Sequence, residues 1–81
     1  MTMANAHRAV IAAADDAATM KRLSTSGDRH TRNAAGCMAR ITAMHSHNDH
    51  NYAQEMQHAD DALFCLPMDE IDKMISAYEK G

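Results

Sequence analysis

Large aliphatic and aromatic side chains are scarce in this chain, and that scarcity limits the folds open to it. Leu, Ile, Val and Phe together occupy nine of the 81 positions, whereas alanine occupies sixteen and methionine eight. Alanine and methionine favour helices, and the β-branched and aromatic residues that strands prefer are few. We therefore predict an all-α protein whose helices meet through small or flexible side chains.

The same composition bears on whether one copy is stable alone. A domain of this length buries only about 60% of the surface that its unfolded chain exposes, and alanine adds little apolar area to each helical turn. The net charge of −3 is too small to indicate a disordered chain. We therefore expect residues 1–81 to form a single helical domain that associates into a homo-oligomer, with a dimer favoured.

The spacing of apolar residues predicts a small bundle of three or four helices, at about 3–23, 28–45, 52–65 and 67–79. Ser24 to Asp28 contains the small and capping residues that end one helix and begin the next, and Pro67 suits the first turn of the last helix. Gly36 falls inside the second helix, where glycine costs about 1 kcal/mol relative to alanine. We expect it to mark a close contact between helices.

The polar run from His45 to Asn51 leaves one boundary open. Its residues are poor helix formers and favour a turn. Apolar residues nevertheless keep their helical spacing through this run, from Met38 to Leu63. The alternative is therefore one long helix over 28–65 with polar residues in its middle.

Charge and cysteine content limit the possible function classes. Residues 1–50 hold six basic and four acidic side chains, whereas residues 51–81 hold two basic and seven acidic ones. Such a dipolar chain can pair with a second copy, and its net acidity argues against nucleic-acid binding. Two isolated cysteines, no recognisable signal peptide and no apolar stretch of spanning length predict a cytoplasmic protein outside the membrane.

A histidine-rich segment is the most specific candidate for a metal site. The run from His45 to His50 matches H-x-H-x-D-H and resembles the zinc-binding signature of the metallo-β-lactamase family. That family needs β-strands and a longer chain, so we do not assign it. A metal-binding or metal-stabilised protein is an alternative function, with zinc held by His45, His47, Asp49 and His50. A solvated polar turn is the simpler interpretation.

Two further clusters could bind ligands. Arg29, His30 and Arg32 lie at the start of the second helix, where main-chain N–H groups favour anions, and predict a site for a small nucleotide-like anion in an oligomer. Glu55 and His58 form a Glu-x-x-His pair, as in di-iron bundles, although no partner glutamate is evident. Solvated or ion-paired surface side chains explain both clusters more simply.

No nucleophile–base arrangement or glycine-rich phosphate loop occurs, so we do not expect an enzyme. The strongest functional signal is surplus apolar helix surface, above all on the amphipathic last helix. We predict a non-enzymatic interaction module, an inhibitor or adaptor that binds and occludes a larger protein, as accessory factors of phages and plasmids do. The expected contacts, where the core leaves them free, are Ile71, Met74, Ile75 and Tyr78.

Overall fold

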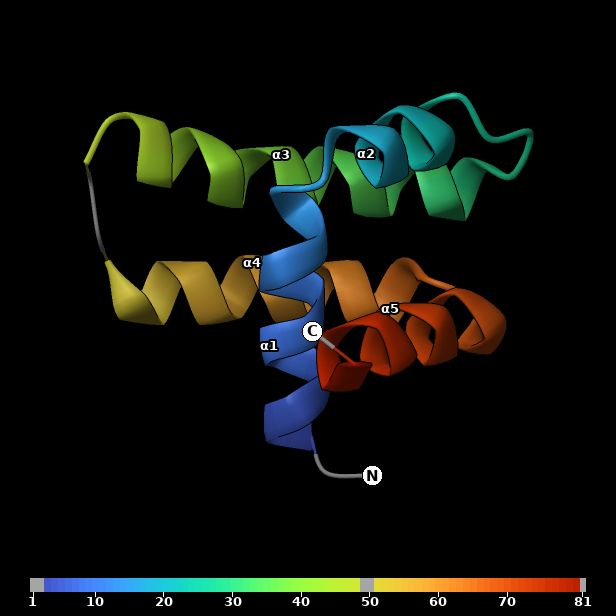
Figure 1. Ribbon diagram of the computed structural model, residues 1–81. Coiled ribbons are helices and arrows are strands. Elements are labelled where there is room, and N and C mark those ends of the chain that lie inside the picture. Colours follow the sequence, from blue (N-terminus) through green and yellow to red (C-terminus); the bar gives the residue numbers. More distant parts are fainter. Residues whose placement is uncertain (1–2, 49–50, 81) are drawn as a thin grey trace.

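The computed structural model describes residues 3–48 and 51–80, and each regular element in these ranges is a helix (Figure 1). The helices are α1 (Met3–Ala14), α2 (Ala17–Ser24), α3 (Arg29–Ser46), α4 (Tyr52–Cys65) and α5 (Met68–Lys80). The all-α prediction is confirmed. The described part of the chain contains five helices rather than three or four.

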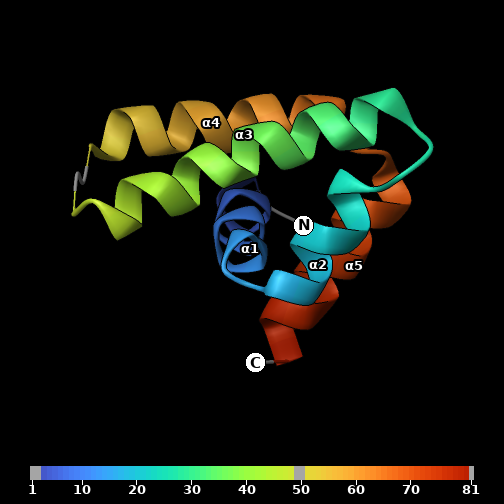
Figure 2. The same ribbon diagram turned by 90° about the horizontal axis from the view of Figure 1, so that it is seen from above.

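Helices α3 and α4 lie side by side and run in opposite directions, forming a helical hairpin (Figures 1 and 2). Helix α1 crosses this hairpin and contacts both of its members as well as α5, and α2 packs against α3. Figure 2 shows α1, α2 and α5 on the same side of the hairpin. The described part of the chain therefore leaves the other side of the hairpin uncovered.

The core combines a few large side chains with many alanines. The largest side chains that are wholly buried are Val10, Leu23, Met38 and Ile41. Alanines from α1, α3 and α4 fill the space between them, and small side chains let helices approach closely. The radius of gyration is 11.5 Å, close to the value of about 12 Å for a compact domain of this length. One copy thus closes a core of its own, and the oligomeric state stays a prediction.

The predicted first helix, 3–23, is wrong because the chain forms two helices there. Asp16 caps α2, and its carboxylate accepts hydrogen bonds from the main-chain N–H (3.3 Å) and the hydroxyl of Thr19. An aspartate in this position competes with continuation of the preceding helix. Figure 1 shows that α2 leaves α1 in a new direction, and this turn brings Leu23 into the core.

The alternative of one helix over 28–65 is also wrong. Helix α3 ends at Ser46, and Asn48 has a left-handed backbone with a φ of 56°, a conformation that asparagine tolerates better than most residues. Asn51 caps α4 by accepting a hydrogen bond from the N–H of Gln54 at 3.2 Å. The predicted turn therefore starts later than expected, since His45 is still helical, and residues 49–50 lie outside the described residues.

Candidate functional site

The four contact residues expected on the last helix do not share one environment. Ile71, Met74 and Ile75 are buried in the core of the subunit. Tyr78, in contrast, is 38% exposed. Of these four side chains, the core thus leaves Tyr78 free for a partner, and a candidate contact surface on α5 has to be sought around it.

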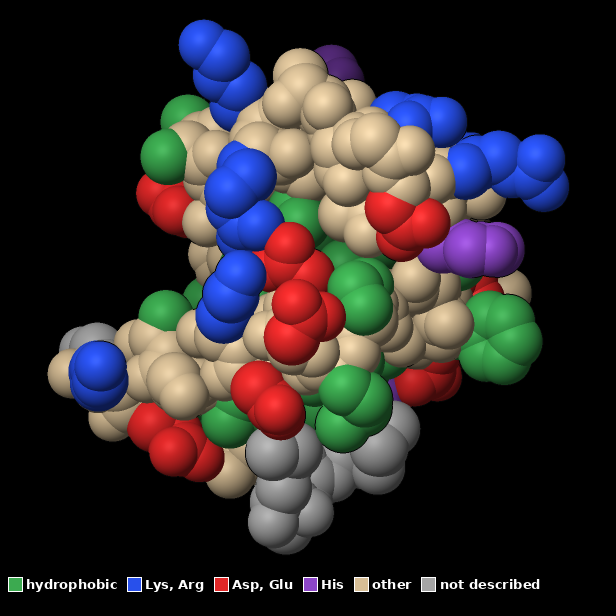
Figure 3. Space-filling view, turned by 90° about the vertical axis from the view of Figure 1, so that its right-hand side faces the viewer, with side chains coloured by type: hydrophobic (Ala, Val, Ile, Leu, Met, Phe, Trp, Pro, Cys, Tyr) green, Lys and Arg blue, Asp and Glu red, His purple; other side chains and the backbone are tan. Residues whose placement is uncertain are grey.

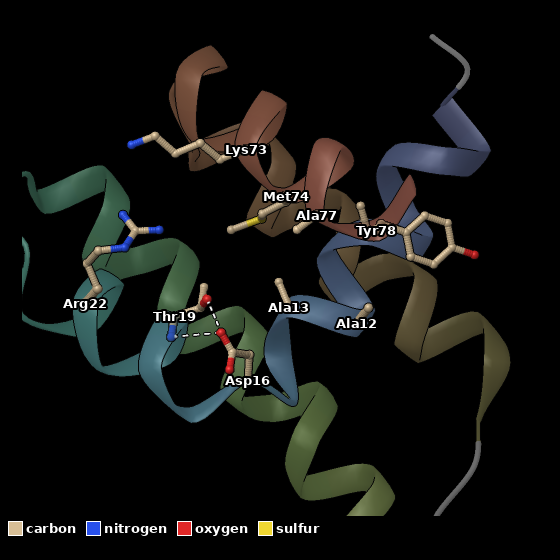
Figure 4. A pocket seen from close by; sticks show the side chains of 10 residues that line it. Ala12, Ala13, Asp16, Thr19, Arg22, Lys73, Met74, Ala77 and Tyr78 are labelled. Carbon is tan, nitrogen blue, oxygen red and sulfur yellow. Dashed lines mark hydrogen bonds between the residues drawn. The ribbon is translucent and has the colours of Figure 1, made fainter. Parts of the chain in front are cut away.

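Tyr78 lies at an open groove between α1, α2 and α5 (Figure 4). The groove has a volume of about 280 Å³. Its apolar lining comes from α1 and α5 and consists of Ala9, Ala12, Ala13, Met74 and Ala77. Its polar lining comes from the same side of α5 and from α2 with its capping residue, and consists of Asp16, Thr19, Arg22 and Lys73.

The groove exists because α1 lines it with alanines, whose short side chains do not fill the space between α1 and α5. Ala12 is exposed and Ala13 is half-buried, so neither fills the space between α1 and α5. The side chains labelled in Figure 4 come from three helices and from Asp16, the capping residue of α2, and they surround this hollow. Tyr78 adds a ring with a polar end, a combination common at interfaces that are partly wet. The hollow therefore suits an apolar side chain supplied by another molecule.

Charged groups define one rim of the groove. Arg22 donates a hydrogen bond to Glu70 at 2.6 Å, and this bond raises the pKa of the Arg22 guanidinium. Because Glu70 is mostly buried and already holds Arg22, it leaves Lys73 weakly paired at 3.9 Å. The Lys73 side chain is 63% exposed. Its ammonium group is thus largely exposed to solvent at the rim of the groove.

The predicted metal site does not assemble among the described residues. His45 Nε2 lies 3.0 Å from Glu55 Oε1, and His45 Nδ1 lies 4.0 Å from Asp15 Oδ1. His47 is exposed at the end of α3, while Asp49 and His50 lie outside the described residues. Within residues 3–48 and 51–80, no group of three or more His, Cys, Asp or Glu side chains could hold a metal ion. His45 instead connects α3 to α4 and to the α1–α2 junction.

The same contact explains the Glu-x-x-His pair on α4. Glu55 faces His45 across the hairpin, which occupies the carboxylate that an iron site would need. His58 is half-buried, and its Nδ1 atom has no hydrogen-bond partner in the described structure. Glu55 therefore serves contact between α3 and α4, and it does not form a ligand pair with His58 among the described residues.

At the predicted anion site, the residue that caps α3 already occupies the N-terminus of that helix. Arg29, His30 and Arg32 are exposed, and Arg32 donates a hydrogen bond to the carbonyl oxygen of Ser26 at 2.6 Å. The carboxylate of Asp28 accepts hydrogen bonds from the hydroxyl and the N–H of Thr31, which lowers the pKa of Asp28. Since a carboxylate already occupies the N-terminus of α3, the positive end of this helix is not open to a second anion.

Two features were not found from the sequence. The first is the share of α1 and α2 in the groove, because the sequence does not show that α1 packs against α5. The second is Phe64, which is 92% exposed at the end of α4. Its position off the apolar face of α4, next to Leu63 on that face, was the available signal.

Comparison with protein-family models, with curated proteins and with solved structures gives no match for this chain. Its function is therefore argued from the described surface alone. None of the described helices combines the length and the apolar character needed to cross a membrane.

Proposed function

We propose that this protein is a non-enzymatic interaction module, an inhibitor or adaptor that binds a larger protein and occludes part of its surface. The observation that carries the proposal is the open groove at Tyr78, which is apolar inside and charged at its rim. Small-molecule sites are usually more enclosed, whereas an open groove between helices suits a side chain presented by another protein.

The lining of the groove indicates what the partner offers. Alanines and Met74 accept a bulky aliphatic or aromatic side chain, because their short or flexible side chains leave room for it. The ammonium group of Lys73 can donate a hydrogen bond to a carboxylate near that side chain. The partner segment is accordingly a helix or extended stretch with an apolar anchor next to Asp or Glu.

Self-association is part of the proposal. A dimer would present two copies of the groove, and two linked contacts bind more tightly than either one alone when both can be engaged. The unpaired cysteines Cys37 and Cys65 suit the reducing cytoplasm, which is the compartment we propose for this activity.

Photocrosslinking from the groove tests the proposal. A photoreactive amino acid replaces Tyr78 in one variant and Ser76, an exposed residue of α5 that does not line the groove, in a matched control. After crosslinking in the native host, we expect one protein to be enriched at position 78 and not at position 76. That protein is then purified for a binding assay and for an assay of its own activity.

The purified pair gives the decisive result. Tyr78→Ala should weaken binding about thirtyfold, the usual effect of removing a central aromatic anchor, and Lys73→Glu should weaken it further by charge repulsion. Binding of the unaltered protein should also reduce or redirect the partner's activity. Equal crosslinking at positions 76 and 78, or binding that is unaffected by Tyr78→Ala, would show that the groove is not the contact surface.

A further inference from the structure

One face of the α3–α4 hairpin is uncovered by the described part of the chain. Helices α1, α2 and α5 pack on the opposite face (Figure 2). The exposed residues on the uncovered face, which we call the outer face of the hairpin, include Asn33, Gly36, Arg40, Gln57, Asp61 and Phe64. This face does not contain the groove at Tyr78.

Gly36 has no explanation inside one subunit. It lies in the middle of α3, where glycine costs about 1 kcal/mol relative to alanine. A Cβ atom built on Gly36 would meet no atom within 4 Å. The close contact between helices that the sequence led us to expect is therefore not made within the subunit, and the space above Gly36 is open to another molecule.

The register of the hairpin places Gly36 of α3 at the same level as Phe64 of α4. His45 and Glu55 contact each other across the two antiparallel helices, on the side that faces Asp15. Nine residues before His45 is Gly36, and nine residues after Glu55 is Phe64. Nine residues carry both helices the same distance along the hairpin and turn both by two and a half turns. Gly36 and Phe64 are therefore level, and each points away from the other helix of the hairpin and from the side of Asp15.

Phe64 is the largest apolar group on this face. Its side chain is 92% exposed, whereas phenylalanine is among the residue types most often buried. A phenylalanine ring exposed to this degree forms a projection on α4, and the open position at Gly36 lies level with it on α3. Two such surfaces can fit together, because the projection of each can pack over the open position of the other.

The charges on the hairpin complement each other in the same way. The fully ionised side chains of α3 are all basic and those of α4 are all acidic. Glu55 and Asp60 contact His45 and His7, so the charges on the outer face include Arg40 from α3 and Asp61 from α4. Along the right-hand edge of Figure 3, which looks onto the end where α3 begins, Lys or Arg side chains lie at the top, a His side chain lies below them and a hydrophobic side chain lies lower still. A second copy turned by 180° about an axis parallel to the hairpin would set α3 of each copy on α4 of the other.

We propose that two copies of this chain form a symmetric dimer through the outer faces of their α3–α4 hairpins. In this dimer Phe64 packs over Gly36 of the partner subunit. By the same register Arg40 lies opposite Asp61 of the partner subunit, and each contact occurs twice because the interface is symmetric. The inference rests on the self-association in the proposed function but not on the groove at Tyr78, which stays accessible in both copies.

Analytical ultracentrifugation over a dilution series tests the dimer. The unaltered protein should change from a single 8.9 kDa subunit toward twice that mass as its concentration rises. Phe64→Ser and Gly36→Glu should each weaken the dimer at least tenfold while the circular dichroism of the subunit stays unchanged, since both positions are exposed. Tyr78→Ala serves as the control that should leave the dimer intact.

Charge exchange identifies the interface itself. Arg40→Asp and Asp61→Arg should each weaken self-association at least tenfold, because each sets like charges against each other in the symmetric pair. An equal mixture of the two variants should restore a dimer, since it contains two complementary pairs.

A protein that stays a single subunit at every concentration overturns the inference, as does an oligomer unaffected by Phe64→Ser or a mixture that does not associate. If those results occurred while Tyr78 still crosslinked specifically, the groove proposal would stand and the dimer would not.

Discussion

Replacing Ile41 by alanine should show how much the stability of this alanine-rich subunit depends on its few large side chains. Ile41 on α3 is wholly buried in the core. The substitution removes three carbon atoms, worth about 2.4 kcal/mol in lost burial. The cavity left behind raises the expected loss to about 3.5 kcal/mol. A protein of this length has a free energy of unfolding of about 4–12 kcal/mol, so this one change would remove a large part of it.

Ile11→Ala is the matched control, because the same atoms are removed from a side chain that is only half-buried. Both variants are compared with the parent by urea denaturation in a Phe64→Ser background, which excludes stabilisation by self-association. We expect the free energy of unfolding to fall by about 3.5 kcal/mol for Ile41→Ala, with an unchanged m-value, and by less than half as much for Ile11→Ala. Equal losses for the two variants would refute the assignment of Ile41 to the core.

Three further predictions concern the helix interior, a helix cap and a thiol. Gly36→Ala in the Phe64→Ser background should raise the free energy of unfolding by about 1 kcal/mol, because alanine favours the helix and its Cβ meets nothing. A lower melting temperature in thermal denaturation would contradict this. Asp28→Ala should lower the melting temperature at neutral pH. Because the pKa of Asp28 is lowered in the folded state, that difference should disappear as the pH falls below the ordinary value of 3.8 and through the lower folded one; Asp28→Asn, which keeps a capping oxygen, is the control. Burial raises the pKa of the Cys37 thiol. In a Cys65→Ser background, Cys37 should therefore react with a disulfide reagent at mildly alkaline pH more slowly than a free thiol does. The two rates should become equal only in denaturant.

Helix content and most helix ends could be predicted because they depend on short-range physics. Pro67 and the acidic residues after it set the start of α5, and Asp28 sets the start of α3 through a hydrogen bond to Thr31 three residues away. Asp16 uses the same chemistry with Thr19. The break that it makes was missed because alanines on both sides continue the apolar spacing, and the spacing carried more weight than the cap.

Candidate sites were harder to predict because they join residues that are distant in the chain. His45 reads as a metal ligand from its histidine neighbours, yet its contacts come from Glu55 and Asp15. Ile71, Met74 and Ile75 read as surplus surface on an amphipathic helix. Periodicity shows that such a face exists but cannot show whether the same subunit or a partner covers it, and here the subunit covers it.

The amino-acid sequence by itself therefore determined that this chain is helical and where most of its helices begin, since propensity, caps and proline act within a few residues. The tertiary structure alone decided which apolar groups stay outside the core. The direction taken by α1 opens the groove at Tyr78, and packing of three helices on one side of the hairpin leaves Gly36 and Phe64 uncovered on the other. Burial depends on how whole helices are placed in space, and that placement is the sum of many weak contacts between segments far apart in the chain.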